Sequence, residues 1–232
     1  MRNMPRTTVL WARVLFVMMM AGMAAELWAA DSYEAALSLF WEGRRLEMAE
    51  TKQTESQNAF QRSLAMTERL LSTDSANPDL QTLKTWNLFR LRRYADTVIY
   101  AQTVLAVRQD LRILETMAEA LYFLGKNEEA LTAFARYFSL ARENDERLSS
   151  AYYYVGEIYL RLKKYEHADI ALSTAVALEK NMYYWWYRLG VVKEQLGQYR
   201  RAYEAYSRAL ELRAGFSPAK DARERVKAKS SL

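Results

Sequence analysis

The sequence has no cysteine, one histidine, three prolines and seven glycines among its 232 residues. The lack of cysteine excludes disulfide bonds, thiolate nucleophiles and cysteine metal sites. So few glycines and prolines are unusual for a protein rich in strands or loops, because tight turns use both residues heavily. Abundant leucine, alanine, glutamate and arginine, with an apolar fraction of 51%, predict an all-α protein with a packed core.

Residue types that perform chemistry are also scarce. The only histidine, His167, lies between Glu166 and Ala168. One histidine without cysteine provides neither a nucleophilic triad nor a histidine metal site. There is no glycine-rich loop of the kind that binds phosphates. We therefore expect a protein that is not an enzyme and that needs no metal or cofactor.

The formal net charge of +5 lies outside the body of the chain. Residues 1–30 carry three arginines against one glutamate, and residues 217–232 carry five lysines and arginines against two acidic residues. Residues 31–216 are therefore formally neutral, which gives no support to a nucleic-acid partner. The basic end either contacts an acidic lipid or protein, or is a solvated helix end.

Residues 1–30 have the three parts of a secretory signal peptide. A basic start precedes a 12-residue apolar run from Val14 to Ala25, and small residues follow. Twelve residues rise about 18 Å as a helix, which is shorter than the roughly 30 Å of a bilayer core. We expect cleavage near Ala29 or Ala30 and export to the periplasm or cell envelope. The alternative is an uncleaved segment that anchors the chain in a membrane.

Small and aromatic residues recur at an offset of 34 positions. Gly156 is repeated as Gly190, and Tyr165 as Tyr199. Two alanine pairs have the same offset, namely Ala168 with Ala202 and Ala175 with Ala209. A fixed period of this length indicates an array of helix pairs, each burying its apolar face against the next.

The order of these residues resembles the tetratricopeptide repeat family. The positions that carry the resemblance are Gly156, Ala168, Ala175, Trp186, Gly190, Ala202 and Ala209. The resemblance implies a right-handed α-solenoid of antiparallel helix pairs, in which Trp186 packs on the buried stripe. Lys193 departs from the family pattern, which has an aromatic residue there.

Successive units divide the chain as follows. Residues 31–110 form degenerate, repeat-like pairs over 32–73 and 78–110. Three units that resemble the family follow at 111–144, 149–182 and 183–216, and residues 217–232 form a basic capping helix. Four extra residues near 145–148 separate the first two of these three units, and we expect them to lengthen a helix by about one turn.

The resemblance also implies a binding groove, lined by set positions on the first helix of each pair. Those positions hold Arg112, Glu115, Glu119, Tyr122, Phe123, Tyr153, Glu157, Arg161, Tyr184 and Tyr187. Aromatic residues with acidic patches between them would suit a basic or apolar peptide. The alternative is a solvated helix face on which the tyrosines are incidental.

These observations lead us to expect an exported scaffold that binds a protein or peptide partner. A different class also fits, namely a solute-binding or transport accessory protein that holds a small apolar ligand in its aromatic groove. A third reading is a membrane-anchored assembly subunit, which requires that residues 1–30 stay attached.

Overall fold

A computed structural model describes residues 31–49 and 51–229, which form eleven α-helices and no β-strand. The all-α class expected from composition is therefore confirmed. The predicted signal peptide, residues 1–30, lies outside the described residues. Among the helices described, none combines the length and the apolar character needed to cross a membrane.

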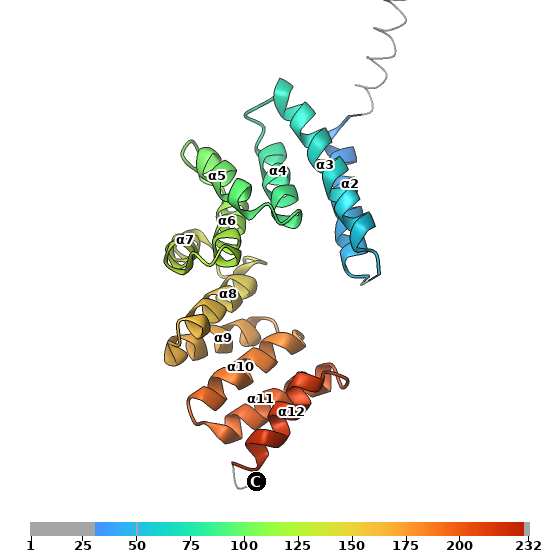
Figure 1. Cartoon of the computed structure of the whole chain (residues 1–232). Coiled ribbons are helices and arrows are strands. Elements are labelled where there is room, and N and C mark those ends of the chain that lie inside the picture. The colour runs from blue at the N-terminus through green and yellow to red at the C-terminus, as the bar shows by residue number, and fades with distance from the viewer. Residues whose placement is uncertain (1–30, 50, 230–232) are drawn as a thin grey trace, which may run out of the picture. The chain divides into compact units, whose positions relative to one another are not determined.

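The chain divides into two compact units between Arg93 and Tyr94. The first unit contains α2 (Tyr33–Glu47), α3 (Gln53–Thr73) and α4 (Pro78–Arg90) (Figure 1). The second begins with α5 (Tyr94–Leu105), so the boundary falls inside the expected pair at 78–110.

A close helix contact organises the first unit. A Cβ atom added to Gly43 of α2 would lie 2.7 Å from the ring of Phe60 on α3, so only glycine fits without a shift. Phe60 belongs to a core cluster with Ala36, Phe40 and Leu83. The buried Ser63 hydroxyl donates to the carbonyl of Ala36 at 2.7 Å, which ties α3 to α2.

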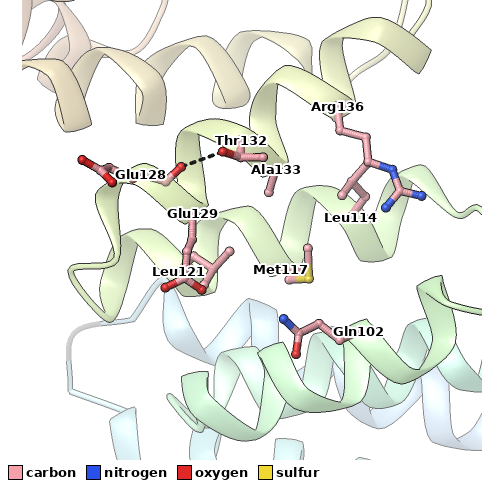
Figure 2. Close-up of a pocket in the computed structure, with 9 residues that line it drawn as sticks. All are labelled: Gln102, Leu114, Met117, Leu121, Glu128, Glu129, Thr132, Ala133 and Arg136. Carbon is pink, nitrogen blue, oxygen red and sulfur yellow. Dashed lines mark hydrogen bonds between the residues drawn. The ribbon is translucent and has the colours of Figure 1, made fainter.

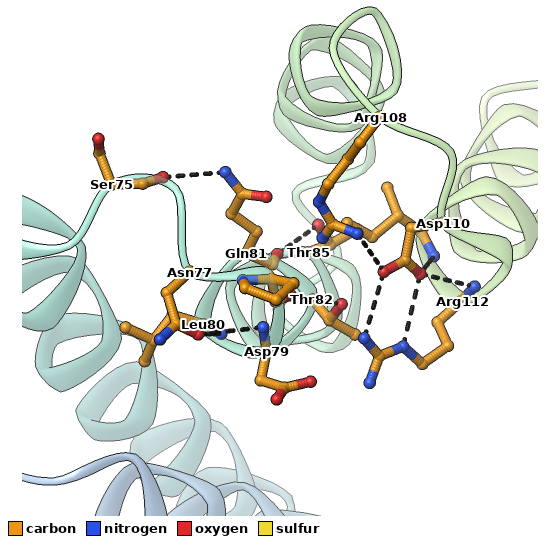
Figure 3. Close-up of polar contacts among 12 residues, drawn as sticks. Ser75, Asn77, Asp79, Leu80, Gln81, Thr82, Thr85, Arg108, Asp110 and Arg112 are labelled. Atoms are coloured by element: carbon orange, nitrogen blue, oxygen red, sulfur yellow. Dashed lines mark hydrogen bonds and ion pairs between the residues drawn. The ribbon is translucent and has the colours of Figure 1, made fainter.

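Capping side chains set the start of two helices, one in each unit (Figure 3). In the first unit, the Asn77 side chain accepts a hydrogen bond from the Leu80 N–H at 3.1 Å, which begins α4. In the second, Asp110 accepts from the Arg112 N–H at 2.9 Å. Burial alone would raise the pKa of Asp110, but hydrogen bonds from Arg112 and Arg108 hold that pKa below its ordinary value. Both caps satisfy N–H groups that have no partner inside the helix.

The second unit continues as three helix pairs and a final helix (Figure 1). The pairs are α6 (Leu111–Phe123) with α7 (Asn127–Leu140), α8 (Leu148–Arg161) with α9 (Tyr165–Leu178), and α10 (Tyr183–Gln195) with α11 (Tyr199–Leu212). The last helix, α12 (Ser217–Lys227), packs on α11. This stacking of consecutive helix pairs is an α-solenoid.

Small residues lie where the paired helices touch. A Cβ atom on Gly156 would lie 2.5 Å from Leu172, and one on Gly190 would lie 2.5 Å from Tyr206. The four alanines of the repeat pattern are fully buried, namely Ala168, Ala175, Ala202 and Ala209. Close helix approach at these positions explains why the pattern uses glycine and alanine there.

The four extra residues do not lengthen a helix, so that expectation was wrong. Residues 141–147 form a seven-residue connection between α7 and α8, whereas four residues, 179–182, join α9 to α10. Asp145 shapes this connection by accepting hydrogen bonds from the Tyr137 hydroxyl at 2.6 Å and from the Arg147 N–H at 2.9 Å. These bonds favour an ordered loop over another helical turn, and they place Arg147 just before α8.

Candidate functional site

Three tyrosines gather on one side of the second unit. Tyr122 of α6, Tyr153 of α8 and Tyr184 of α10 come from the first helices of consecutive pairs. Ionised Tyr153 would be repelled by Glu157, Tyr184 and Tyr122 and attracted by Arg188, which places these four groups within electrostatic range of Tyr153. Arg188 donates from Nε to Glu157 Oε1 at 2.6 Å. We call these five residues the tyrosine face.

The hydroxyl groups of this face remain protonated. Burial, reinforced by the charge of Glu157, raises the pKa of Tyr153 and of Tyr122 above the usual value for a phenol. Burial also raises the pKa of Tyr184. At neutral pH the three side chains therefore present neutral O–H groups that can donate hydrogen bonds.

The three rings differ in how firmly they are packed. Tyr153 stacks on Trp185 with the ring centres 5.0 Å apart, and Trp185 is 7% exposed. The Arg161 guanidinium lies over the Tyr122 ring, 4.3 Å from its centre, in a cation–π contact. Tyr184 is the most open of the three, with 41% of its surface exposed. Tyr153 is thus a supported platform, and Tyr184 is available to a partner.

The predicted acidic patches do not lie open. Arg147 Nη2 donates to Glu115 at 2.8 Å and to Glu119 at 3.1 Å. The carboxylate side chains are 2% and 4% exposed, whereas the Arg147 side chain is 47% exposed. Glu157 repeats this arrangement, being 7% exposed under an Arg188 side chain that is 23% exposed. Each carboxylate is more buried than the arginine to which it bonds, and Glu115 and Glu119 share one arginine.

Glu115 and Glu119 also interact with each other. Burial, and then the nearby charge and hydrogen bond of Glu119, raise the pKa of Glu115 well above its ordinary value, despite the opposing effect of Arg147. Glu115 therefore gives up its proton less readily than an isolated glutamate does.

Other residues predicted to line the groove lie around this face. Tyr187 contacts Tyr184, but it packs against Tyr206 and Phe216 in the cluster that α12 covers. Phe123 stacks on Tyr94 with ring centres 4.9 Å apart. Arg112 bonds to the Asp110 cap at the start of α6. Of the predicted residues, Tyr122, Tyr153 and Tyr184 lie within electrostatic range of the ion pair that Glu157 forms with Arg188.

The two tryptophans at the start of α10 differ in burial. Trp186, predicted to lie on the buried stripe, is only half-buried, and its indole N–H donates to the Lys180 carbonyl at 2.9 Å. It still packs against the core formed around Leu172, Leu189 and the buried Trp185. Trp185 is therefore the tryptophan that fills the interior.

Sequence reasoning missed the two arginines that complete these pairs. Arg188 is 31 positions from Glu157, and Arg147 is 32 from Glu115. Neither arginine occupies a groove position in the family pattern. A buried carboxylate needs a positive or hydrogen-bonding partner, but only the packing of neighbouring helices selects which arginine supplies it.

A separate cavity of about 400 Å³ lies between α5, α6 and α7 (Figure 2). Its lining combines buried Leu114, Met117, Leu121 and Ala133 with exposed Gln102, Glu128, Glu129, Thr132 and Arg136. No aromatic residue lines it, so it does not match the aromatic groove proposed for a small apolar ligand. Within residues 31–49 and 51–229, no cluster of three or more acidic or histidine side chains is arranged to hold a metal ion.

Comparison with known families supports the repeat pattern directly. The sequence profile described as "Tetratricopeptide repeat" matches residues 149–182 and residues 183–216. Residues 149–216 therefore form two tetratricopeptide repeats. No curated protein matches it by sequence.

Solved structures share the fold of this chain. A crystal structure of MamA superposes with a TM-score of 0.57 at 21% identity, over 64% of this chain and 85% of that one. MamA from Desulfovibrio magneticus RS-1 gives a TM-score of 0.59 at 21% identity, over 66% and 84%. YrrB, described as a TPR protein with an unusual peptide-binding site, gives 0.58 at 16% identity, over 82% and 92%. At these identities the similarity concerns the fold alone.

Proposed function

We propose that this protein is an exported, non-enzymatic scaffold that binds a protein or peptide partner on its tyrosine face. One observation carries the proposal: three tyrosines from α6, α8 and α10 lie within electrostatic range of a single Glu157–Arg188 ion pair. Aromatic residues and arginine are enriched at protein interfaces, because both offer a large contact area together with directional hydrogen bonds. A peptide lying across the three helices would contact all three tyrosines.

Several further observations favour a macromolecular partner. Tetratricopeptide repeats recur in interaction scaffolds, and YrrB is described as having a peptide-binding site. The face is supported from below by the stack of Tyr153 on Trp185, so a partner would meet an ordered surface. Order before binding lowers the entropy lost on association.

Site-directed photo-crosslinking tests the location of the partner. A photoreactive phenylalanine analogue would replace Tyr184 in one variant and Ile170 in another. Ile170 lies on α9 and is 70% exposed, so it serves as a matched control outside the face. We expect a crosslinked partner at position 184 and none at position 170, and mass spectrometry would then identify it.

Calorimetry with the identified partner tests the energetics. Tyr184→Ala should weaken binding by at least about tenfold, since buried tyrosine anchors at interface centres contribute strongly. Ile170→Ala should bind like the parent, and both variants should melt near the parent temperature. Crosslinking at 170 alone, or unchanged affinity in Tyr184→Ala, would place the partner on a different surface.

A further inference from the structure

On and around the tyrosine face, acidic and basic side chains differ in how exposed they are, and this difference decides what the face can bind. Glu157 on this face and Glu115 and Glu119 beside it are buried, with side chains 7%, 2% and 4% exposed. The arginine side chains that bond to them are more exposed, 23% for Arg188 and 47% for Arg147. The positive partner of each ion pair is thus the one more open to an approaching peptide.

Some guanidinium donors remain available to a ligand. Among the residues that the structure describes, Arg188 makes one hydrogen bond, from Nε to Glu157, which leaves its two terminal nitrogens without a protein acceptor. Arg161, which is exposed, bonds to the Tyr122 carbonyl and the Asn127 side chain, both at 3.0 Å. It has no carboxylate partner within residues 31–49 and 51–229. Planar guanidinium groups with free N–H bonds bind carboxylates in a two-pronged geometry.

The tyrosines add neutral donors beside these arginines. The hydroxyls of Tyr153 and Tyr184 donate to no acceptor among the described residues, and Arg188 lies within electrostatic range of both. Phenol O–H groups and guanidinium N–H groups together offer many donors, and the Glu157 carboxylate beside them is already paired with Arg188. Such a site suits an anionic group flanked by rings or apolar side chains.

We propose that the tyrosine face binds an acidic peptide segment, with an aspartate or glutamate side chain of the partner on Arg188 and its aromatic neighbours against Tyr153 and Tyr184. This rests on the proposed function and names the partner chemistry for that same face. It reverses the basic or apolar peptide expected from sequence, because the glutamates behind that expectation are already paired beneath arginines. A lysine in the same place would face guanidiniums and would lack an open carboxylate.

Three labelled peptides of matched shape separate the charge classes. The acetylated, amidated sequences GDWEWDG, GNWQWNG and GKWKWKG are acidic, neutral and basic, and share two tryptophans that suit an aromatic surface. Fluorescence anisotropy with the full chain should show the acidic peptide binding at least about tenfold more tightly than the neutral one, and the basic peptide binding most weakly. Raising salt from about 0.05 M to about 0.5 M should reduce this preference, because exposed charges are screened.

Variants then assign the preference to Arg188. Replacing the ion pair by amides, Glu157→Gln with Arg188→Gln, should abolish the preference for the acidic peptide while keeping a hydrogen-bonding pair in the same place. Glu157→Gln alone releases the guanidinium and should tighten acidic-peptide binding several-fold. Arg208→Gln, which breaks an exposed pair with Glu211 on α11, serves as the matched control and should leave all three affinities unchanged. Melting curves identify any variant that has lost its fold, and the salt series on the parent protein needs no variant.

The outcomes distinguish this inference from the proposed function. Equal or tighter binding of the neutral or basic peptide, weakened by Tyr184→Ala, would overturn the acidic preference and keep the face as the binding site. Binding of no peptide, or binding that Tyr184→Ala does not weaken, would overturn both. A preference for the acidic peptide that survives loss of Arg188 would remove that residue from the proposal.

Discussion

At the scale of single residues, Gly190 shows how little space separates paired helices. A Cβ atom there would lie 2.5 Å from two ring carbons of Tyr206, which is fully buried. Gly190→Ala should therefore lower the free energy of unfolding by about 1–3 kcal/mol through overpacking. Urea denaturation monitored by circular dichroism would measure the loss.

Gly215 supplies the control for that substitution. A Cβ atom on Gly215 would meet nothing within 4 Å. Gly215→Ala should unfold within about 0.5 kcal/mol of the parent, as surface substitutions usually do. Equal losses in the two variants would mean that α10 and α11 do not approach each other as closely as described.

Glu115 should make stability depend on pH. Its pKa in the folded protein is raised well above the ordinary 4.5, first by burial and then by Glu119. The protonated Glu115 side chain thus stabilises the folded state fully below about pH 4.5, and this stabilisation is lost as the pH rises through the folded-state pKa. Glu115→Gln keeps a group that can bond to Arg147 and Glu119, so it should gain stability relative to the parent as pH increases. Urea unfolding at a series of pH values would show the difference.

Glu194 should behave in the opposite sense. A hydrogen bond from Arg225, outweighing burial, lowers the pKa of Glu194 below its ordinary value. The ionised Glu194 side chain therefore stabilises the folded state above the pKa that this residue has in the unfolded chain, and this stabilisation is lost as the pH falls through the folded-state pKa. Glu194→Gln should therefore be less stable than the parent at neutral pH, and the deficit should shrink in acid. If the stability of Glu115→Gln and of Glu194→Gln, each relative to the parent, changed in the same direction with pH, the environments described for these two glutamates would be contradicted.

At the scale of elements, the turns inside the helix pairs share one backbone conformation. Gly125 between α6 and α7 and Gly197 between α10 and α11 have φ of 75° and 70°. The corresponding turn between α8 and α9 places Lys163 at a φ of 57°. The left-handed region disfavours a side chain, so this turn retains strain that the other two avoid.

Lys163→Gly should relieve that strain. We expect the free energy of unfolding to rise by about 0.5–1 kcal/mol, because the steric relief exceeds the extra flexibility that glycine gives the unfolded chain. Lys164→Gly is the control, since Lys164 has a φ of −87° and gains only flexibility. Thermal unfolding should rank Lys163→Gly above the parent and Lys164→Gly below it. The reverse order would exclude strain at this turn.

At the scale of the whole molecule, export remains a proposal that depends on residues 1–30. We predict that protein produced in a secreting host begins at Ala30 or Asp31, because the apolar run from Val14 to Ala25 is too short to span a bilayer core. Intact-mass measurement of the soluble envelope fraction would test this. A full-length species confined to the membrane fraction would instead favour an anchored protein.

The sequence by itself determined the all-α fold and the repeated helix pairs. Helical periodicity and the 34-residue recurrence of glycine and alanine are readable because each depends on neighbours close along the chain or on exact repetition. The positions of Tyr122, Tyr153 and Tyr184 on first helices were readable for the same reason. No structural contact was needed to place them on the first helices of successive units, where they occupy the twelfth, fifth and second positions of those units.

Only the tertiary structure decided the charge and depth of the candidate site. Glu157 and Arg188 are 31 positions apart, and their ion pair exists because α8 and α10 bring them together. The seven-residue connection before α8 likewise delivers Arg147 to Glu115 and Glu119. Local pattern identifies a glutamate but not its burial or its partner, since both depend on side chains from helices distant in sequence. For this reason the sequence predicted an acidic groove, whereas the structure has buried carboxylates paired with more exposed arginines.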